Sequence, residues 1–285
     1  MSKSNRKIAI AVPVSIISDV PHLREKTLKI GMIGRAAAIF RVNEIIVYAD
    51  VLGVNQKHDR NLIATILEYI ETPQYLRKRL FNIKPELKYA GILPPLRTPH
   101  HPLAKFTKEL NIGEYREGVI LSVNEQGSIV DIGVERHALI PNKHLTINTR
   151  VTVKITQLGK RPQATLANKD EIEQYWGYTV VTSKETFGQI TKSHSYDLVI
   201  ATSKIGTPIT EVTDKLTKRW KNANKILVAF GAPSQGLQEI VAQEKLKLEE
   251  VTDFVVNTLP AQGTETVRTE EALFASLSIL NTLTK

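Results

Sequence analysis

Two short apolar segments near the C-terminus, each followed by a loop that contains glycine, constrain this chain more than any other feature. They lie at Ile226–Phe230, followed by 231–236, and at Phe254–Val256, followed by 257–263. Short runs of Ile, Val, Leu and Phe bounded by Gly and Pro are typical of buried parallel strands. Open α/β sheets bind ligands in the loops at the carboxyl ends of such strands. The pair therefore predicts an α/β domain with a ligand site at one edge of its sheet.

The letters of these two loops, FGAPSQGL and NTLPAQGTETVRTEEAL, resemble the cofactor end of the SPOUT superfamily of knotted RNA methyltransferases. The likeness is closest to the archaeal and eukaryotic branch that carries an inserted OB-fold, and it extends over nearly the whole chain. It implies a SPOUT-type open sheet with a C-terminal trefoil knot and a homodimer paired through the knot face. The alternative is two ordinary strand–loop turns of any doubly wound domain.

The composition favours a nucleic-acid partner. The chain has 285 residues and a formal net charge of +9, and a basic excess of this size favours an acidic partner, although a soluble basic protein would share it. The absence of cysteine excludes disulfides, thiolate metal sites and a cysteine nucleophile. Adjacent His100 and His101 do not suit one metal ion, so we expect no metal, and the alternative for them is a loop pair near the substrate path. Pro13 interrupts the first apolar run, and no segment approaches the ~20 apolar residues that span a bilayer, so we expect a cytoplasmic protein without membrane contact.

The first part of the α/β domain is predicted over residues 1–105. Apolar runs predict strands at Ile8–Val12 and Val42–Tyr48, with a helix over His22–Phe40 between them. Four prolines in 91–103 predict a stiff connection rather than a helix or strand. The apolar face of the helix is expected to carry Leu23, Leu28, Ile33 and Ala37.

Residues 106–167 change to the alternating pattern of short strands, which predicts a small closed β-barrel, and the α/β pattern returns over 168–285. The series GVILSV, GSIVDIG, HALIP and RVTVKI resembles the OB-fold of RNA-binding proteins. The alternation is expected to point inward Val119, Leu121, Ile129, Ile132, Val151, Val153 and Ile155. The exposed basic residues of the barrel would bind RNA phosphates; the alternative is that the barrel is a spacer that binds nothing. The basic candidates are Arg116, Arg136, His137, Lys143, His144, Lys154, Lys160 and Arg161.

The resemblance implies that the two loops hold S-adenosylmethionine, the methyl donor, against their backbone. Thr202 and Ser203, which follow a predicted strand at Asp197–Ala201, would line the same pocket. The implied contacts are Thr202, Ser203, Phe230, Gly231, Ala232, Pro233, Gly236, Asn257, Leu259, Pro260, Gln262, Gly263 and Val267. In the last helix, Glu270 and Glu271 are expected to stabilise the positive helix end. Leu273, Leu277 and Leu280 belong either to the core or to the dimer interface.

Arg35 is the catalytic candidate, because its segment resembles the early SPOUT motif in which an arginine follows a short helix and precedes a strand. In that family the arginine contacts RNA and helps to activate the acceptor. A guanidinium stays protonated, so its expected role is to orient a phosphate or the acceptor, unless it is a surface arginine without a role. Arg41 is the rival and an RNA-contact candidate, and Asn43 is a weaker third.

The expected function is methylation of a structured ribosomal or transfer RNA. The alternatives are a non-catalytic RNA-binding or assembly factor that keeps the cofactor pocket, and a protein methyltransferase. The residues do not distinguish a ribose oxygen from a base nitrogen as the acceptor.

Overall fold

The computed structural model describes residues 6–283, and the chain divides into two compact units. The first comprises Met1–Glu68, Glu86–Pro94 and Tyr178–Lys285, and the second comprises Tyr69–Pro85 and Pro95–Gly177. The second unit is larger than the 106–167 predicted for the insert, because the flanking segments pack against the barrel. The outer ends of the predicted 1–105 and 168–285 segments lie outside the described residues.

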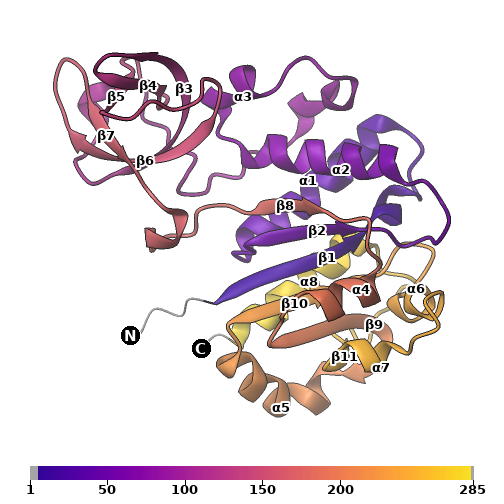
Figure 1. Cartoon of the computed structure of the whole chain (residues 1–285). Helices are drawn as coiled ribbons and strands as arrows, with labels where there is room; N and C mark the ends of the chain where they lie inside the picture. The colour runs from indigo at the N-terminus through magenta and orange to yellow at the C-terminus, as the bar shows by residue number, and fades with distance from the viewer. Residues whose placement is uncertain (1–5, 284–285) are drawn as a thin grey trace. The chain divides into compact units, whose positions relative to one another are not determined.

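The first unit is built on a six-stranded sheet in the order β11-β9-β10-β1-β2-β8, with every pair parallel (Figure 1). The predicted open α/β sheet is therefore confirmed. Strand β1 pairs with β10, and β2 pairs with β8, so segments from before and after the barrel make one sheet. The strands are β1 (Lys7–Pro13), β2 (Glu44–Tyr48), β8 (Thr179–Thr182), β9 (Leu198–Pro208), β10 (Lys225–Ala229) and β11 (Phe254–Asn257).

Helices cover both faces of this sheet. The face that carries Ala9, Ile46 and Leu227 packs against buried apolar residues of α4, α6 and α7, and on the other face α1 packs against α8. Leu273, Leu277 and Leu280 of α8 are buried, which places them in the core. The α-helices are α1 (Leu23–Ile39), α2 (Lys57–Glu71), α3 (Gln74–Leu80), α4 (Phe187–Ser193), α5 (Ile209–Asn222), α6 (Leu237–Ala242), α7 (Leu248–Val251) and α8 (Thr269–Thr282). The 3₁₀ turns are η1 (Val14–Ile17), η2 (Pro85–Leu87), η3 (Ala90–Ile92), η4 (Thr107–Glu109) and η5 (Lys169–Glu171).

The buried face of α1 differs from the predicted one. Leu28 is 47% exposed, whereas its neighbour Lys29 is buried beside Ile30 and Ile33. Lys29 and Ile33 are one helical turn apart, so both lie on the same side of the helix. The ion pairs described below neutralise the charge of the buried lysine. Leu28 faces outward with Ile39, which is 49% exposed.

The second unit contains a closed barrel in the order β3-β4-β5-β7-β6, which confirms the predicted barrel. Val119, Ile132, Val153 and Ile155 are fully buried as predicted. The predicted inward direction of Leu121 and Ile129 is wrong: both are half-buried, and Ile120 and Val130 lie in the core instead, because the β3–β4 ladder shifts register between Ile120 and Ser122. Val151 packs against the core from a half-buried position. The strands are β3 (Tyr115–Asn124), β4 (Gly127–Asp131), β5 (Ala138–Pro141), β6 (Arg150–Gln157) and β7 (Gln163–Leu166).

Candidate functional site

The structure brings the two glycine-bearing loops to one edge of the sheet. Strands β10 and β11 flank β9, and all three are parallel, so their loops leave the sheet on the same side. Two strand spacings separate the loops at their bases, which is roughly 10 Å. This is a suitable span for one flat ligand held by both loops.

Strand β9 is longer than predicted and connects the two loops. It continues past Ala201 to Pro208, so Thr202 and Ser203 lie in the strand rather than after it. The Thr202 hydroxyl donates a 2.9 Å hydrogen bond to the carbonyl of Ala229, the last residue of β10. The Lys204 ammonium donates to the carbonyl of Glu265, two residues after the second loop, over 2.6 Å. The end of β9 is therefore bonded to the residue before the first loop and to the chain just after the second loop.

Gly206 permits the close approach of β9 to β11. A Cβ atom at Gly206 would lie 2.8 Å from the carbonyl carbon of Val256 and 2.9 Å from that of Val255. Only glycine fits this contact without a backbone shift. The spacing of the loops therefore depends on this residue.

The first loop is held by hydrogen bonds of its own backbone. The Phe230 amide donates to the Ala11 carbonyl over 3.0 Å, and its carbonyl accepts from the Tyr48 hydroxyl at 3.2 Å. Burial, with Asp50 and Glu244 nearby, raises the pKa of Tyr48, which keeps this hydroxyl a donor. The Phe230 backbone is therefore already bonded within the fold, and its ring is buried, so a bound donor would meet the residues that follow it.

The rest of this loop forms a tight turn. The Ala232 amide, next to Pro233, donates to the Gln235 carbonyl over 2.8 Å, and the Gly231 carbonyl accepts from the Thr269 hydroxyl at 3.1 Å. Because Thr269 begins α8, this last bond joins the first loop to the helix that follows the second loop.

The second loop is held by its own amide side chains. Asn257 donates from Nδ2 to the Lys204 carbonyl over 2.7 Å and accepts the Leu259 amide over 2.9 Å, so it is a clamp between loop and strand. Gln262 donates from Nε2 to the carbonyls of Thr264 and Glu265. Pro260 is exposed beside this turn, and Val267 is half-buried at its end.

The glycines of the two loops differ in what surrounds them. A Cβ atom built on Gly236 or Gly263 meets no atom within 4 Å, so both present bare backbone to open space. At Gly231 the Cβ atom would instead lie 3.1 Å from the Gln235 carbonyl and 3.2 Å from the amide of Leu237. The open backbone at Gly236 and Gly263 fits a flat adenosine-like group, while Gly231 serves the shape of its own loop.

A buried lysine beside these loops was not identified from the sequence. Lys29 of α1 lies with its ammonium 2.7 Å from a carboxylate oxygen of Asp19 and 3.3 Å from one of Glu270. Glu271 caps α8 by accepting the Arg268 amide, as predicted, whereas Glu270 turns inward. The sequence signal for this burial was that Lys29 precedes the apolar Ile33 by four residues, a spacing that places both on the same side of a helix. The ion pairs join α1 to the first turn of α8, where Thr269 holds the first loop.

The catalytic candidates lie away from this edge. Helix α1 begins after the carboxyl end of β1 and ends before the first residue of β2, and half-buried Arg35 lies ~18 Å along it from Leu23 at 1.5 Å per residue. Arg41 has a left-handed φ of 57° in the turn that ends α1. Asn43 uses its side-chain oxygen to accept the Ile8 amide over 2.9 Å, which gives it a structural role.

The basic residues of the barrel that were predicted to be exposed are exposed, with one exception. The prediction that Arg116 is exposed is wrong: it is fully buried, with bonds to Glu114 at 2.9 Å and to the Ile132 carbonyl at 3.1 Å. Arg136 donates to the Lys160 carbonyl over 3.2 Å. These two cations and Arg161, the residue after Lys160, therefore lie at one end of the barrel. The exposed candidates are Arg136, His137, Lys143, His144, Lys154, Lys160 and Arg161.

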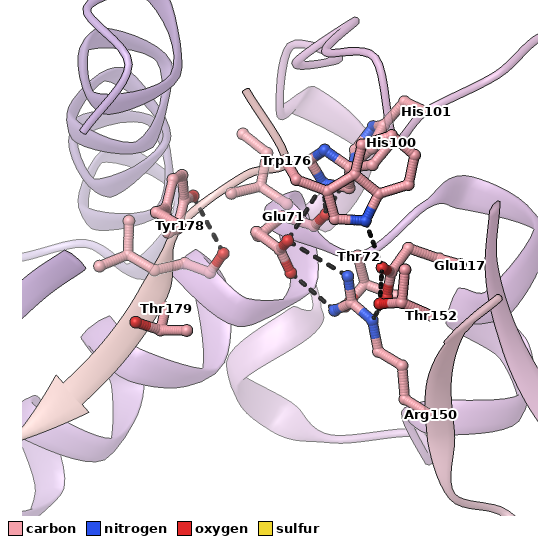
Figure 2. Close-up of polar contacts among 12 residues, drawn as sticks. Glu71, Thr72, His100, His101, Glu117, Arg150, Thr152, Trp176, Tyr178 and Thr179 are labelled. Atoms are coloured by element: carbon pink, nitrogen blue, oxygen red, sulfur yellow. Dashed lines mark hydrogen bonds and ion pairs between the residues drawn. The ribbon is translucent and has the colours of Figure 1, made fainter. Parts of the chain in front are cut away.

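A buried polar cluster fixes the segments around the barrel (Figure 2). Arg150 pairs with Glu71 and with Glu117, each at 2.6 Å, and the His100 ring nitrogen lies 3.1 Å from a Glu71 oxygen. Glu117 also accepts the Trp176 indole N–H over 2.6 Å. Burial opposes the charge of Glu71, but His100 and Arg150 outweigh it and lower its pKa to about 2.

The cluster also holds the two histidines of the proline-rich segment. The Nε2 atom of His101 lies 2.6 Å from the Glu71 carbonyl, and Nε2 of His100 lies 3.0 Å from the same oxygen. Burial first, and then the neighbouring His100, lowers the pKa of His101 to about 4, so its ring is neutral at pH 7. Within residues 6–283, no group of three or more potential ligands is placed to hold a metal ion, and no helix is long and apolar enough to cross a membrane.

Comparison with known proteins places this geometry in context. A family model described as "Putative RNA methyltransferase" matches residues 7–280. The chain is 36% identical to the 28S rRNA (uridine-N(3))-methyltransferase of Drosophila melanogaster over 96% of its own length, and it spans only 61% of that protein. It is 33% identical to the human protein of the same name, over 96% of this chain and 77% of the human one. An uncharacterized protein of Haloarcula marismortui is 33% identical over 97% of this chain and 99% of its own.

Proposed function

Because the chain belongs to this family of RNA methyltransferases, we propose that it transfers a methyl group from S-adenosylmethionine to N3 of a uridine in ribosomal RNA. The names of the fly and human relatives support the nucleotide and the atom. The observation that carries the donor site is the pair of glycine-bearing loops at one sheet edge, with β9 bonded to the strand end before the first loop and to both ends of the second. We also propose that the protein works in the cytoplasm.

The finer fold assignment is part of the same proposal. The motifs of the two loops and the parallel sheet support a SPOUT domain with a C-terminal trefoil knot. The closed barrel with exposed cations supports an OB-fold that binds RNA phosphates through Arg136, Lys143, Lys154, Lys160 and Arg161. Arg41, exposed in the turn after α1, is a further phosphate contact.

The residues around the loops would hold the donor in place. Backbone at 231–236 and 259–263, with Thr202 and Ser203 beside it, would contact the adenosine, and Val267 would close one side. The bound donor supplies an electrophilic methyl group on a sulfonium. Uridine N3 must lose its proton, here to water, and the negative charge then spreads over the uracil ring until the N–C bond forms, the methyl–sulfur bond breaks and the neutral thioether leaves. A fixed guanidinium next to the ring stabilises this charge, and this is the role proposed for Arg35.

We place the outer face of α1 within the homodimer interface expected at the knot face, because such a dimer would explain how Arg35 reaches the chemistry. In one chain Arg35 lies ~18 Å along α1 from the helix end at the loop edge. Leu28, Met32, Arg35 and Ile39 share one face of α1, and its two apolar ends, Leu28 and Ile39, are 47% and 49% exposed. A second copy packed on this face would cover the two apolar side chains and bring Arg35 toward its partner's loops.

The dimer is tested by light scattering on the full chain. Leu28→Glu combined with Ile39→Lys is expected to give a monomer that still folds, because neither side chain belongs to the core. Activity should fall with dimerisation. A double variant that stays dimeric would show that another face pairs the copies.

The reaction is tested with isotopically labelled methyl donor and ribosomal RNA transcribed in vitro, followed by digestion to nucleosides. We expect label in 3-methyluridine. Label on ribose or on another base would correct the acceptor, and label on polypeptide would indicate a protein methyltransferase. No transfer to any RNA or protein, with intact RNA binding, would identify a non-catalytic binding factor.

A further inference from the structure

A groove in the second unit lies outside the residues assigned above. It has a volume of about 420 Å³ and is formed by α3, the proline-rich segment 95–105 and Gly133 of the barrel. A groove of this size accommodates a small organic ligand or one nucleotide unit. The groove adjoins the cluster of Figure 2: the Tyr75 hydroxyl donates to the Glu117 carbonyl over 2.8 Å, and His101 contacts the Glu71 carbonyl.

Among residues 6–283, the groove is lined by cations and by no acidic side chain. Arg77, Arg97 and Lys105 line it, and the last two are exposed to solvent. The Arg77 guanidinium is fixed in place, because it donates to the carbonyls of Thr72 at 2.9 Å and Ile70 at 3.1 Å. Two acids lie near Lys105, and both carboxylates accept backbone amides: Glu109 those of Lys105 and Phe106, and Glu135 that of Thr107. The site is therefore electrostatically suited to an anion.

The walls of the groove are mostly apolar. Pro95, Pro102 and Leu103 contribute to them, and Leu103 is 78% exposed. The ring of Tyr75 lies flat against Gly133, where a Cβ atom would be 2.7 Å from it. A phosphate ion alone does not need such walls, whereas a nucleobase does.

An exposed aromatic ring follows the groove along the chain. Phe106 is 52% exposed, and the Lys108 ammonium lies 5.6 Å from its ring centre. Apolar and aromatic surfaces beside cations are typical of proteins that bind single-stranded nucleic acid, where bases stack and phosphates pair with Lys and Arg.

One wall of the groove is bonded into the fold through His101. His101 is anchored to the Glu71 carbonyl, and Glu71 is fixed in turn by Arg150. Arg97 has a left-handed φ of 54°, an uncommon conformation that the segment maintains. A site whose walls are already ordered loses less entropy on binding.

We propose that this groove binds one nucleotide of single-stranded RNA, with its base between the apolar walls and its flanking phosphates on Arg97 and Lys105, while the next base stacks on Phe106. The proposal rests on the proposed function only in taking the RNA substrate as the ligand. Because uridine N3 lies on the pairing edge of the base, the substrate must be unpaired around the target, and such RNA can enter a groove of this kind.

The test is fluorescence anisotropy with the full chain, a labelled oligouridine and a duplex of equal length. Arg97→Asn keeps the left-handed backbone, since Asn tolerates it, and Lys105→Ala removes an exposed side chain. Each is expected to weaken single-strand binding by about three- to tenfold and to reduce its salt dependence, and Phe106→Ala should weaken it by a similar factor. Lys84→Ala, an exposed lysine of the same unit outside the groove, is the matched control and should bind like the wild type.

Several outcomes would contradict the proposal that the groove binds RNA. Unchanged binding in the combined Arg97→Asn and Lys105→Ala variant would do so, as would equal losses in Lys84→Ala. Competition by polyglutamate as strong as that by oligouridine would indicate a general polyanion surface. If the wild type methylates RNA while the groove variants bind normally, the groove fails and the proposed function stands. If no RNA is methylated but the groove variants lose affinity, the groove binds RNA as proposed and the proposed function fails.

Discussion

Gly236 and Gly263 are the residues that most directly test the donor site. Both lie in the two loops, and both have open space where a side chain would project. Gly236→Val should fold normally, because its φ of −72° suits any residue, and should lower S-adenosylmethionine affinity at least tenfold by occupying the ligand's place. Calorimetry measures the affinity.

The control for this substitution is Gly91→Val, which also meets no atom within 4 Å but lies in η3, away from the loops. It should bind the donor normally. Gly231→Val is a poor probe, because its side chain would strike the backbone of its own loop. If Gly236→Val and Gly91→Val bind equally well, the donor does not lie over this loop.

Arg41 permits an unusually clean test of an RNA contact. It occupies the left-handed position after α1, where Val42 donates to the Ala37 carbonyl over 2.8 Å, and glycine is the preferred residue there. Arg41→Gly should therefore keep or raise stability, by up to ~1 kcal/mol. It should weaken RNA binding severalfold while donor affinity is unchanged.

Arg35→Ala should instead lower the methylation rate with little change in RNA affinity. Reaction rates and filter binding on the same RNA separate the two arginines. Equal effects of both substitutions on affinity alone would show that Arg35 has no role in the chemical step.

At the scale of elements, the contact between α1 and α8 depends on one buried cation. Lys29→Met would leave the Glu270 carboxylate buried without its partner, and removing one member of a buried pair costs about 3–5 kcal/mol. Donor binding should weaken too, because Thr269 of the same turn holds the Gly231 carbonyl. Urea unfolding and calorimetry measure these effects.

Lys26→Met is the matched control, because Lys26 lies on the same helix but pairs at 3.5 Å with an Asp59 that is 42% exposed. It should cost less than ~1 kcal/mol. The double variant Lys29→Met with Glu270→Gln should recover part of the loss. A Lys29 variant as stable as the Lys26 variant would show that the buried pair contributes nothing.

At the scale of the whole molecule, the second unit should be the more acid-sensitive. The pKa of His101 is lowered from 6.5 to about 4, and that of Glu71 from 4.5 to about 2. In each case the unfolded chain binds the proton first, so stability is present above the unfolded pKa and is lost as the pH falls. The loss should begin below about pH 6.5 through His101 and continue below about pH 4.5 through Glu71.

The two tryptophans of the chain separate the units in this experiment, since Trp176 lies in the second unit and Trp220 in the first. In a Trp220→Phe background, Trp176 fluorescence should report a stability loss of roughly 1–2 kcal/mol between pH 7.5 and pH 5. His101→Gln keeps a side-chain donor and should flatten this dependence. An equally steep profile in the His101→Gln variant would assign the acid sensitivity to other groups.

The sequence by itself determined the elements and their order. Apolar periodicity and the placement of Gly and Pro predicted five of the six strands of the sheet, helix α1 to within one residue at each end, and the closed barrel between the halves. These features depend on local chain preferences, which a single sequence contains. The letters of the two loops likewise predicted which segments would lie at one edge, because parallel strands place their carboxyl ends together.

Only the tertiary structure decided what each side chain contacts. It placed Lys29 in the core, buried Arg116, shifted the register after Ile120 and moved Arg35 away from the loops of its own chain. It also assembled the groove from α3, the proline-rich segment and the barrel, which lie far apart in sequence. Pairing of a buried charge and the lining of a groove depend on partners dozens of residues away, and periodicity along the chain carries no information about them.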